Sequence, residues 1–545
     1  MLLSVLLAGC VFAINRPSLS FQFILDDHRF TADPRIQNPD HIGDYFTSFV
    51  WAQFIGAQPS FYRPVFLLWL RLNFLVSGLC PRGWHLLSIT KHLLVCGLLG
   101  LLVWKLLRNS TAALLAAALF VLHPAHTESV NWVTVPDPLM ASGVLVALLC
   151  YFKFVDAQVK SVLVEKKKPQ KRSPSKSRDL PFVWFSVSVA AYLGALLAKE
   201  TAIVFPLMIL ALGMRASSAR REFKGSESLR SRLGRAIAHT GPFLAVTGIY
   251  LLLRLNALQG KLGAATQHLR WTTVVLSWPA VLCFYFKAML WPIRSYSFAD
   301  PILVERFSVR GVLFPLVATV VILGVVVLSL YWLRSRVYAR LDSRAIAGLD
   351  FALLAGFLLL VLPLLPALNL NALNPRDFLH GRYTYLPLAG LMLLVGTAWH
   401  LAGRARAALL VASVSVMALF AAGTYSQEGQ WRDDVAVFTT AHQLAPHNEP
   451  VARNLADTHV RAALLLEEQG RCSEAVPVFR EVARNDPQDW YAFAALGYCL
   501  VQMNDLVGAE DSLHHAVDIS HDPNIVQQWQ ELRAHIGLTV PAGRH

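Results

Sequence analysis

Long apolar segments separated by short polar linkers occupy the first 424 residues of this 545-residue chain. Most of them are long enough to cross or nearly cross, as helices, a hydrocarbon core about 30 Å thick. The pattern predicts eleven membrane-spanning helices, at 1–14, 85–104, 112–130, 138–155, 181–198, 201–214, 237–256, 311–333, 349–366, 384–401 and 407–424. The predicted fold class is therefore all-α, a polytopic membrane helix bundle over 1–424 followed by a polar domain over 425–545.

The distribution of positive charge predicts which linkers share a side of the membrane. Lys and Arg concentrate in alternate linkers, namely 105–108, 153–178, 215–235, 334–344 and 404–406. Cytoplasmic linkers carry such an excess, so we expect the N-terminus inside and residues 425–545 outside. The alternation holds only if 257–310 begins and ends on the outer side. We therefore expect its apolar part, 272–292, to lie at the interface or to re-enter rather than to cross.

Composition favours a membrane protein and argues against nucleic acid as a partner. The chain is 55% hydrophobic and 15% charged, with a mean hydropathy of +0.45, whereas soluble proteins carry about 25% charge. Its net charge of +14 comes from the linker clusters, not from a basic surface interleaved with aromatic side chains, which nucleic-acid readers have. The seven Cys form no CxxC motif and no metal spacing with His, so neither a zinc site nor a disulfide framework is predicted.

Residues 425–545 carry an internal repeat. Three positions match three others at a shared offset of 41: Phe438, Pro446 and Leu455 against Phe479, Pro487 and Leu496. The next offset is 34, which pairs Ala475 with Ala509. A period of 34 is that of tetratricopeptide repeats, each a helix–turn–helix, and the longer offset fits one such repeat with two extra helical turns near 457–468. Such arrays form an α-solenoid whose curved surface usually binds peptides.

Five polar clusters fall on the predicted outer face. They are Asp26-Asp27-His28-Arg29, Phe61-Tyr62-Arg63-Pro64, HPAHTESVNW at 123–132, Lys199-Glu200, and 374–377 followed by Gly381-Arg382-Tyr383-Thr384. Ionisable side chains held near a bilayer are costly and usually functional. Arg and Lys side chains can bind a lipid-linked phosphate, and the planar guanidinium of Arg can do so through two parallel hydrogen bonds. A nearby carboxylate suits a general base that deprotonates an acceptor hydroxyl.

Each cluster also has a simpler interpretation. The Asp pair fits a solvated loop, Lys199 a side chain that extends to the interface, and Arg382 a helix anchor beside aromatic residues. His123 and His126 would share a helix face, as two metal ligands do, but Pro124 interrupts that helix. Helix capping and the lining of a polar cavity are therefore favoured over a metal site. The convergence of the clusters on one face favours a functional site.

Taken together, these motifs resemble those of the transmembrane-and-tetratricopeptide protein O-mannosyltransferase family and its bacterial relatives. The likeness rests on HPAHTESVNWV, the early Asp-Asp loop, Tyr-Arg-Pro, Lys-Glu, Arg-Tyr-Thr-Tyr-Leu-Pro and the repeats. That family belongs to the C-type glycosyltransferases, multi-span enzymes that use lipid-phosphate sugars. The resemblance implies a catalytic carboxylate in the first outer loop, which maps to Asp26 or Asp27, and a donor phosphate bound by Arg382 with help from Lys199. The repeat tail is shorter than in animal members, which suits a bacterial relative.

The hypothesis that follows is a membrane glycosyltransferase that moves a sugar, with mannose as one candidate, from a polyprenyl- or dolichyl-phosphate donor to an acceptor hydroxyl. The transfer would take place on the extracytoplasmic face. The predicted base is Asp27 or Asp26, with Asp27 slightly favoured, and the predicted phosphate-binding residues are Arg382, Lys199 and Arg63. The predicted cavity-lining residues are His123, His126, Glu128, Glu200 and Tyr383. A divalent metal is left open as a cofactor, and no other cofactor is predicted.

The predicted partners are the lipid-linked sugar, membrane lipid, and an acceptor protein or peptide bound by the repeats. The compartment would be a bacterial inner membrane with periplasmic repeats, or the endoplasmic reticulum with lumenal ones. Two other classes stay open. A non-catalytic membrane scaffold would work through its repeats, at positions such as Trp490 and Tyr491. A transporter or lipid flippase would need ionisable residues in mid-span and inverted repeats, whereas most ionisable residues here lie at span ends.

Overall fold

The computed structural model describes residues 2–54, 60–167, 179–224, 228–261, 269–293, 298–300, 302–338, 342–372 and 379–537. Over these residues the chain is helical without strands, which confirms the all-α class. Residues 374–377 of the last polar cluster and 168–178 of the basic linker lie outside the described ranges. The chain divides into two units, Met1–Asp433 and Asp434–His545, called here the membrane unit and the C-terminal unit.

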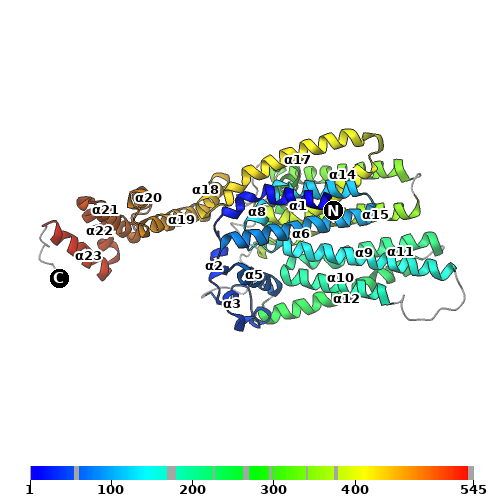
Figure 1. Ribbon diagram of the computed structural model, residues 1–545, viewed down its shortest axis with the longest axis horizontal. Coiled ribbons are helices and arrows are strands. Elements are labelled where there is room, and N and C mark those ends of the chain that lie inside the picture. Colours follow the sequence, from blue (N-terminus) through cyan, green and yellow to red (C-terminus); the bar gives the residue numbers. More distant parts are fainter. Residues whose placement is uncertain are drawn as a thin grey trace. The chain divides into compact units, whose positions relative to one another are not determined.

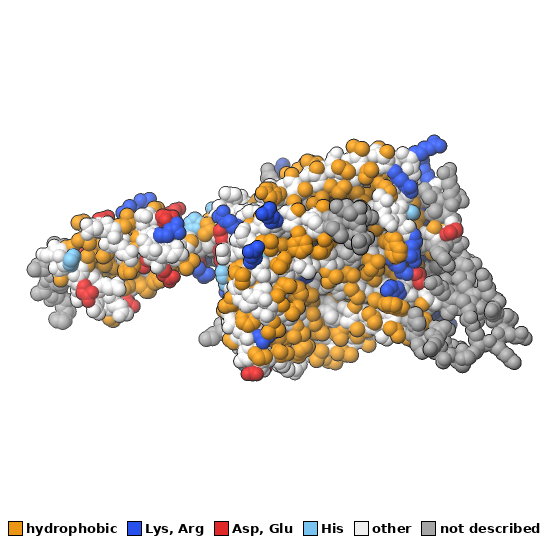
Figure 2. Space-filling view, in the orientation of Figure 1, with side chains coloured by type: hydrophobic (Ala, Val, Ile, Leu, Met, Phe, Trp, Pro, Cys, Tyr) orange, Lys and Arg blue, Asp and Glu red, His pale blue; other side chains and the backbone are white. Residues whose placement is uncertain are grey.

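Long helices run side by side through the membrane unit (Figure 1). They are α1 (Leu2–Ile14), α6 (Pro81–Leu107), α7 (Ser110–Val121), α9 (Asp137–Lys167), α10 (Asp179–Ala198), α11 (Phe205–Lys224), α12 (Leu229–Ala257), α14 (Phe314–Tyr338), α15 (Ser343–Val361), α16 (Tyr385–Leu401) and α17 (Arg406–Glu428). Figure 2 shows hydrophobic side chains along much of the side of this unit, with charged ones toward its ends. This is the surface that a lipid bilayer requires.

Short helices collect at one end of the membrane unit, called here the short-helix end. They are η1 (Arg16–Ser20), α2 (Asp27–Ala32), α3 (Pro34–Gln37), η2 (Pro39–His41), α4 (Asp44–Thr47), α5 (Pro64–Ser77), η3 (Pro124–His126), α8 (Thr127–Asn131), η4 (Glu200–Val204), the π-helical turn η5 (Val309–Leu313), η6 (Leu362–Leu368), η7 (Leu370–Ala372), η8 (Gly381–Thr384) and η10 (Gly429–Trp431). One short turn, η9 (Gly403–Ala405), lies between α16 and α17 at the other end.

Most of the predicted spans are present as helices of membrane length. Among the described residues, nine helices are long and apolar enough to cross a bilayer, and eight of these cover predicted spans. The predicted span 112–130 is broken, because α7 and the η3–α8 pair are bent by 59° around the turn that contains Pro124. Two further predicted spans are helical but are not among the nine: 1–14 forms α1, of 13 residues, and most of 201–214 lies in α11, which begins at Phe205.

The ninth helix is α13 (Trp271–Leu290), which sequence analysis expects not to cross. Its length and composition would allow a span, but both of its ends contact the short-helix end. Before its first turn, the Leu269 amide donates to Asn371 Oδ1 at 2.9 Å. At its last turn, the Met289 carbonyl accepts from His123 Nε2 at 2.9 Å. Asn371 lies in η7, directly after η6, and both η6 and the η3 segment that follows His123 pack against η8, so these contacts share one end of the bundle and α13 lies across that end.

The basic linkers meet at the opposite end of the membrane unit. Arg215 and Arg334 both bind Asp350, Arg334 through Nε at 2.7 Å, and Lys105 binds Asp156. These pairs join α11, α14 and α15, and α6 with α9. Lys105, Arg215 and Arg334, each from a linker that the charge pattern assigns to the cytoplasm, therefore mark one end of the bundle, and the short helices occupy the other.

The C-terminal unit is a series of helices that each pack against the next in the chain. Over its described residues, 434–537, they are α18 (Asp434–Leu444), α19 (Glu449–Glu468), α20 (Cys472–Asn485), α21 (Trp490–Gln502), α22 (Leu506–Ser520) and α23 (Pro523–His535). Ala475 and Ala509, one offset of 34 apart, are both buried. The offset of 41 has a local cause, because α19 has 20 residues where the corresponding α21 has 13. The assignment to the tetratricopeptide class stays a prediction.

The position of α13 can be tested by cysteine labelling in a background without the seven native cysteines. Trp271 and Trp291 are exposed, at 75% and 63%, and flank the helix. We expect Trp271→Cys and Trp291→Cys to react with a membrane-impermeant maleimide from the same side, and Arg108→Cys, which follows α6 at the other end, to react from the opposite side. Labelling of positions 271 and 291 from opposite sides would show that α13 crosses.

Candidate functional site

A cavity of about 970 Å³ opens among the short helices and the ends of α10 and α12. Its wall carries five basic side chains and two carboxylates: Arg29, Arg63, Lys199, Arg254 and Arg382, with Asp26 and Glu200. Most of the remaining wall is aromatic or apolar, and includes Phe30, Trp51, Phe61, Trp132, Tyr250 and Tyr383. An apolar cavity with few, convergent charged groups is the usual form of a ligand site.

Six of the ten residues predicted from sequence line this cavity, and they come from four separate regions of the chain. They are Asp26, Arg63, Lys199, Glu200, Arg382 and Tyr383. The other four, Asp27, His123, His126 and Glu128, are not among its described lining residues. The structure therefore does not place the two histidines and Glu128 in the lining of this cavity, and the slight preference for Asp27 as the base conflicts with its buried position.

Asp27 is completely buried and holds a neighbouring segment in place. Its Oδ1 accepts from the Thr134 hydroxyl at 2.6 Å and from the Thr134 amide at 3.2 Å, and its Oδ2 accepts from the Ile24 amide at 3.2 Å. Burial raises the pKa of this carboxyl to about 7, although the hydrogen bonds from Thr134 act in the opposite direction. Asp27 is thus a positioning residue for the wall at 132–136.

Asp26, next in the chain, has a different environment. It stands at the N-cap position of α2, is only half buried, and lines the cavity. Leu25 before it has φ of 51°, a left-handed conformation that is uncommon for residues other than glycine. Leu25 precedes both carboxylates, and of the two Asp26 lines the cavity while Asp27 enters the protein interior.

Arg63 directly precedes α5, whose first residue is Pro64, a favoured first residue of a helix. Its guanidinium binds Glu200 bidentately, Nε to Oε2 at 2.9 Å and Nη2 to Oε1 at 2.6 Å. Burial alone would raise the pKa of Glu200, but the charge and hydrogen bonds of Arg63 outweigh it and lower this pKa to about 2. Glu200 is therefore ionised at neutral pH and already neutralises Arg63.

Lys199 follows the last residue of α10 and is likewise paired. Its Nζ donates to both carboxylate oxygens of Asp137, at 2.6 and 2.7 Å, and both side chains are 4% exposed. The ammonium also lies 4.7 Å from the centre of the Tyr383 ring. Burial lowers the pKa of Lys199, and the charge of Asp137 opposes that shift. The simpler interpretation of Lys199 as a side chain reaching to the interface is therefore wrong.

Arg382 lies in η8, far from Arg63 in the sequence. Its guanidinium stacks over the Trp132 ring at 4.6 Å. Buried Glu128 supports it from behind, since Oε2 accepts from the Arg382 amide at 3.0 Å and Oε1 lies 3.5 Å from Nη1. Glu128 therefore acts on the cavity through Arg382 rather than by lining it.

The two histidines of the HPAH motif have structural contacts. His123 caps η3, because its Nδ1 accepts from the Ala125 amide at 3.2 Å while Nε2 donates to the Met289 carbonyl. The ring of His126 packs against Phe120 and Tyr385, with ring centres 4.2 and 4.7 Å apart. Within the described ranges no group of three or more His, Cys, Asp or Glu side chains is arranged to hold a metal ion. A divalent metal thus stays a prediction without an assigned site.

Sequence reasoning missed Arg254, His380 and Asp137. Arg254 lies inside a predicted span, but close enough to its end to reach the cavity, where it donates to the Ser60 carbonyl at 2.8 Å. His380 directly precedes the Gly-Arg-Tyr motif and lines the cavity. Asp137 is found only through its contact with Lys199. An arginine near the end of a predicted span is a sequence signal of a functional residue. His380 and Asp137 have no such signal in a single sequence.

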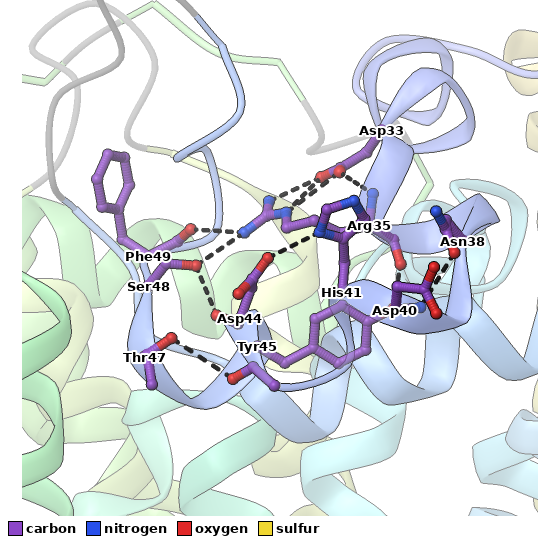
Figure 3. Close-up of polar contacts among 11 residues, drawn as sticks. Asp33, Arg35, Asn38, Asp40, His41, Asp44, Tyr45, Thr47, Ser48 and Phe49 are labelled. Atoms are coloured by element: carbon purple, nitrogen blue, oxygen red, sulfur yellow. Dashed lines mark hydrogen bonds and ion pairs between the residues drawn. The ribbon is translucent and has the colours of Figure 1, made fainter.

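A buried ion pair holds the aromatic wall of the cavity (Figure 3). Arg35 and Asp33 are both fully buried, with Nη2 to Oδ2 at 2.7 Å. On its other side, the Arg35 guanidinium donates to the Ser48 hydroxyl at 3.2 Å and the Phe49 carbonyl at 3.1 Å, and also to the Val50 carbonyl. Val50 and the next residue, Trp51, line the cavity, so this pair fixes the loop that presents them.

The fold together with the cavity defines a class: an all-α polytopic membrane protein with a basic cavity at one end of its bundle. No family model matches the chain. The chain is similar to human protein O-mannosyl-transferase TMTC3, with 22% identity over 93% of this chain and 54% of that protein. It is 26% identical to human TMTC1 over 90% of this chain and 56% of that protein. For Drosophila melanogaster Tmtc1 the identity is 25%, over 88% and 61%.

These similarities confirm the family resemblance drawn from the motifs, and the chain spans somewhat more than half the length of these curated relatives. Among solved structures, it is similar to the Archaeoglobus fulgidus oligosaccharyltransferase tethered with an acceptor peptide, with 13% identity, a TM-score of 0.40, and coverage of 83% of this chain and 58% of that one. For ArnT from Cupriavidus metallidurans bound to undecaprenyl phosphate the values are 14%, 0.37, 98% and 78%.

We expect Arg35→Lys to destabilise the membrane unit by about 2–4 kcal/mol, because one ammonium cannot replace the fork that binds Asp33 and the loop carbonyls. The measurement is the thermal unfolding midpoint in detergent, with Arg16→Lys, at an exposed position of η1, as the matched control. Equal midpoints for the two variants would contradict the assigned role of the pair.

The raised pKa of Asp27 predicts a pH-dependent stability. Between its ordinary value of 3.8 and about 7, the folded chain keeps a proton that the unfolded chain has released, so stability falls as pH rises through this window, by at most about 4 kcal/mol. Above pH 7 the contribution of Asp27 to stability no longer changes with pH. We expect the unfolding midpoint of wild type to fall more between pH 5 and 7.5 than that of Asp27→Asn. Parallel pH profiles would show that Asp27 is ionised in the folded state throughout.

Proposed function

We propose that the membrane unit is a glycosyltransferase that moves a sugar from a polyprenyl- or dolichyl-phosphate donor to an acceptor hydroxyl. The observation that carries this proposal is the shared lining of one cavity by Asp26, Arg382 and Lys199, which sequence reasoning selected independently for proton transfer and phosphate binding. The wall has five formal positive and two formal negative charges, which favours an anionic ligand. The similarity to named protein O-mannosyl-transferases supports the same reaction class.

Asp26, rather than Asp27, is the proposed general base. Asp26 lines the cavity, whereas the oxygens of Asp27 are occupied by Thr134 and Ile24. In the proposed step the acceptor oxygen bonds to the anomeric carbon of the sugar, and its proton passes to the Asp26 carboxylate. The bond between that carbon and the phosphate oxygen breaks, and the lipid phosphate leaves with the electron pair. Basic side chains stabilise the charge that develops on this phosphate.

The basic residues have different proposed roles because carboxylates hold them differently. Arg63 and Lys199 each make a direct, short pair, with Glu200 and Asp137. Their proposed role is to shape the cavity and to contribute to its electrostatic potential, because their nitrogens already bind these carboxylates. Glu128 accepts from the Arg382 backbone amide at 3.0 Å and lies 3.5 Å from Nη1, a longer ion pair than the other two, and the guanidinium stacks over Trp132 in the cavity wall. We therefore assign the first donor-phosphate contact to Arg382.

The finer features of the reaction belong to the same proposal. Mannose is the first sugar to test, because the similar curated proteins are named for its transfer. The C-terminal unit is proposed to bind the acceptor protein, with the half-exposed Tyr491 and Trp490 on its surface. The reaction is proposed on the extracytoplasmic face, in the periplasm or the lumen of the endoplasmic reticulum, because the basic linkers occupy the other end of the membrane unit.

The test is sugar transfer by the full chain in membranes, with polyprenyl- or dolichyl-phosphate mannose as donor. We expect Asp26→Asn to lower the rate by roughly 10²–10⁴-fold, the usual contribution of a general base. Asp40→Asn, an exposed carboxylate of the same loop that does not line the cavity, should transfer at the wild-type rate. Parallel assays with and without chelator test the divalent metal.

Full transfer by Asp26→Asn would overturn the assignment of the base. A wild-type chain that transfers no sugar from either donor, yet loses partner binding on substitution of Tyr491, would instead support the membrane scaffold.

A further inference from the structure

Helix α21 of the C-terminal unit presents an aromatic and apolar side to solvent. Tyr491 and Tyr498 are 47% and 48% exposed, and Val501 is exposed as well. Their spacing of seven and three residues places the three side chains on one side of the helix. Trp490 is also exposed and packs edge-on against Tyr491, with ring centres 5.5 Å apart. These four residues are called here the α21 face.

The composition of α21 differs from that of the other described helices of the C-terminal unit. It contains no Asp, Glu, Lys or Arg, whereas each of α18, α19, α20, α22 and α23 contains at least one of them. A surface helix normally turns charged side chains to water. Exposed aromatic side chains that lie together mark an interaction site more often than scattered ones do, and Tyr and Trp dominate the energetics of protein interfaces. We therefore expect a partner to cover the α21 face.

The sequence around the α21 face is strongly acidic. Residues 486–532, which include α21, α22 and most of α23, contain eight Asp and Glu but no Lys or Arg. The whole C-terminal unit has fifteen Asp and Glu against seven Arg and no Lys, although the net charge of the full chain is +14. Opposite charge attracts a partner and rejects partners of the same sign. The partner that fits this surface is therefore positively charged.

The acidic residues lie before and after α21. Asp486 and Asp489 precede the helix, and Asp505 follows it. A helix of 13 residues is about 20 Å long, which an extended chain covers in about six residues at roughly 3.3 Å each. Basic side chains about six positions apart on an extended segment would therefore reach the acidic residues at both ends. An anionic lipid surface is disfavoured, because lipid of this kind attracts basic segments and repels acidic ones.

We propose that the α21 face binds extended segments of the acceptor protein in which Lys or Arg stand about six positions apart, with apolar or aromatic residues between them. This inference rests on the proposed function, in which a protein supplies the acceptor hydroxyl. It gives the C-terminal unit a role in the choice of acceptor that is separate from the chemistry of the cavity.

The experiment measures binding of two labelled peptides to the full chain in phosphatidylcholine nanodiscs, at about pH 7.5, where ordinary histidine is mostly neutral. The basic peptide has two Arg six positions apart with Leu, Tyr and Ser between them, and the comparison peptide has Glu at both Arg positions. We expect the basic peptide to bind at least about tenfold more tightly in about 0.05 M salt, and to lose most of this preference in about 0.5 M salt, where exposed charges are screened. Empty nanodiscs give the background.

Three variants test the surface. Tyr498→Ser removes one ring of the α21 face and should weaken binding of the basic peptide about tenfold, as truncation of an aromatic anchor does. Asp486→Asn keeps the oxygen that accepts from the Gln488 amide at 3.0 Å and removes the charge, so binding should weaken about two- to fivefold. Tyr425→Ser, at a 65% exposed position of α17, is the matched control and should bind like wild type. Thermal midpoints show whether each variant is folded.

Several results would overturn the inference. Wild-type affinity in Tyr498→Ser would show that the α21 face is not the binding surface. Equal affinity of wild type for the two peptides, or no measurable affinity for either, would overturn the assigned partner chemistry. A change of oligomeric state in Tyr498→Ser, measured by light scattering, would assign the face to a second copy of this chain instead.

A parallel assay separates the inference from the proposed function. It measures sugar transfer by the same nanodiscs to a short hydroxyl acceptor without basic residues. Transfer to this acceptor together with no selectivity between the two peptides would overturn the inference and leave the glycosyltransferase proposal intact. Selective binding of the basic peptide without any sugar transfer would support the binding surface and overturn the proposed function.

Discussion

Charge buried in a low-dielectric interior must be neutralised nearby, and this constraint organises the cavity end of the membrane unit. Removing one partner of such a pair costs several kcal/mol, because the other charge is left unpaired. Lys199 at the end of α10 is held by Asp137 at the start of α9, and Arg63 before α5 is held by Glu200 in η4. Each pair joins elements far apart in sequence. The short helices therefore keep their positions through these pairs as well as through apolar packing.

The same constraint separates two carboxylates that are neighbours in the chain. Asp27 is buried and accepts hydrogen bonds from Thr134 and Ile24, and its burial raises its pKa although these hydrogen bonds act in the opposite direction. Asp26 keeps contact with the cavity. Adjacent residues thus have different chemistry, because one carboxylate is buried against Thr134 and the other lines the cavity.

Sequence reasoning predicted the fold better than the site, for physical reasons. Hydrophobic length and charge alternation are local signals, and they located most of the long helices and the element that lies across the bundle end. Six of the predicted site residues also share the cavity, because motifs at span ends collect at the same end of a bundle. The roles of Asp137 and Glu128 depend on partners 62 and 254 residues away in sequence, and one sequence contains no record of such pairs. The choice between Asp26 and Asp27 depends on which of the two contacts Thr134, a residue 107 positions away in sequence from Asp27.

The helix that lies across the bundle end has a consequence for how deep the protein sits in its membrane. Exposed indole rings of Trp271 and Trp291 flank α13, and such rings prefer the level of the lipid headgroups. Through Met289 and His123, the same helix is joined to the segment that leads into Glu128. Held at the headgroup level by these rings, α13 would fix the height of the cavity relative to the headgroups through this contact. In bilayers of different thickness the spans would adjust by tilting, while the cavity would stay level with the phosphates of its own leaflet.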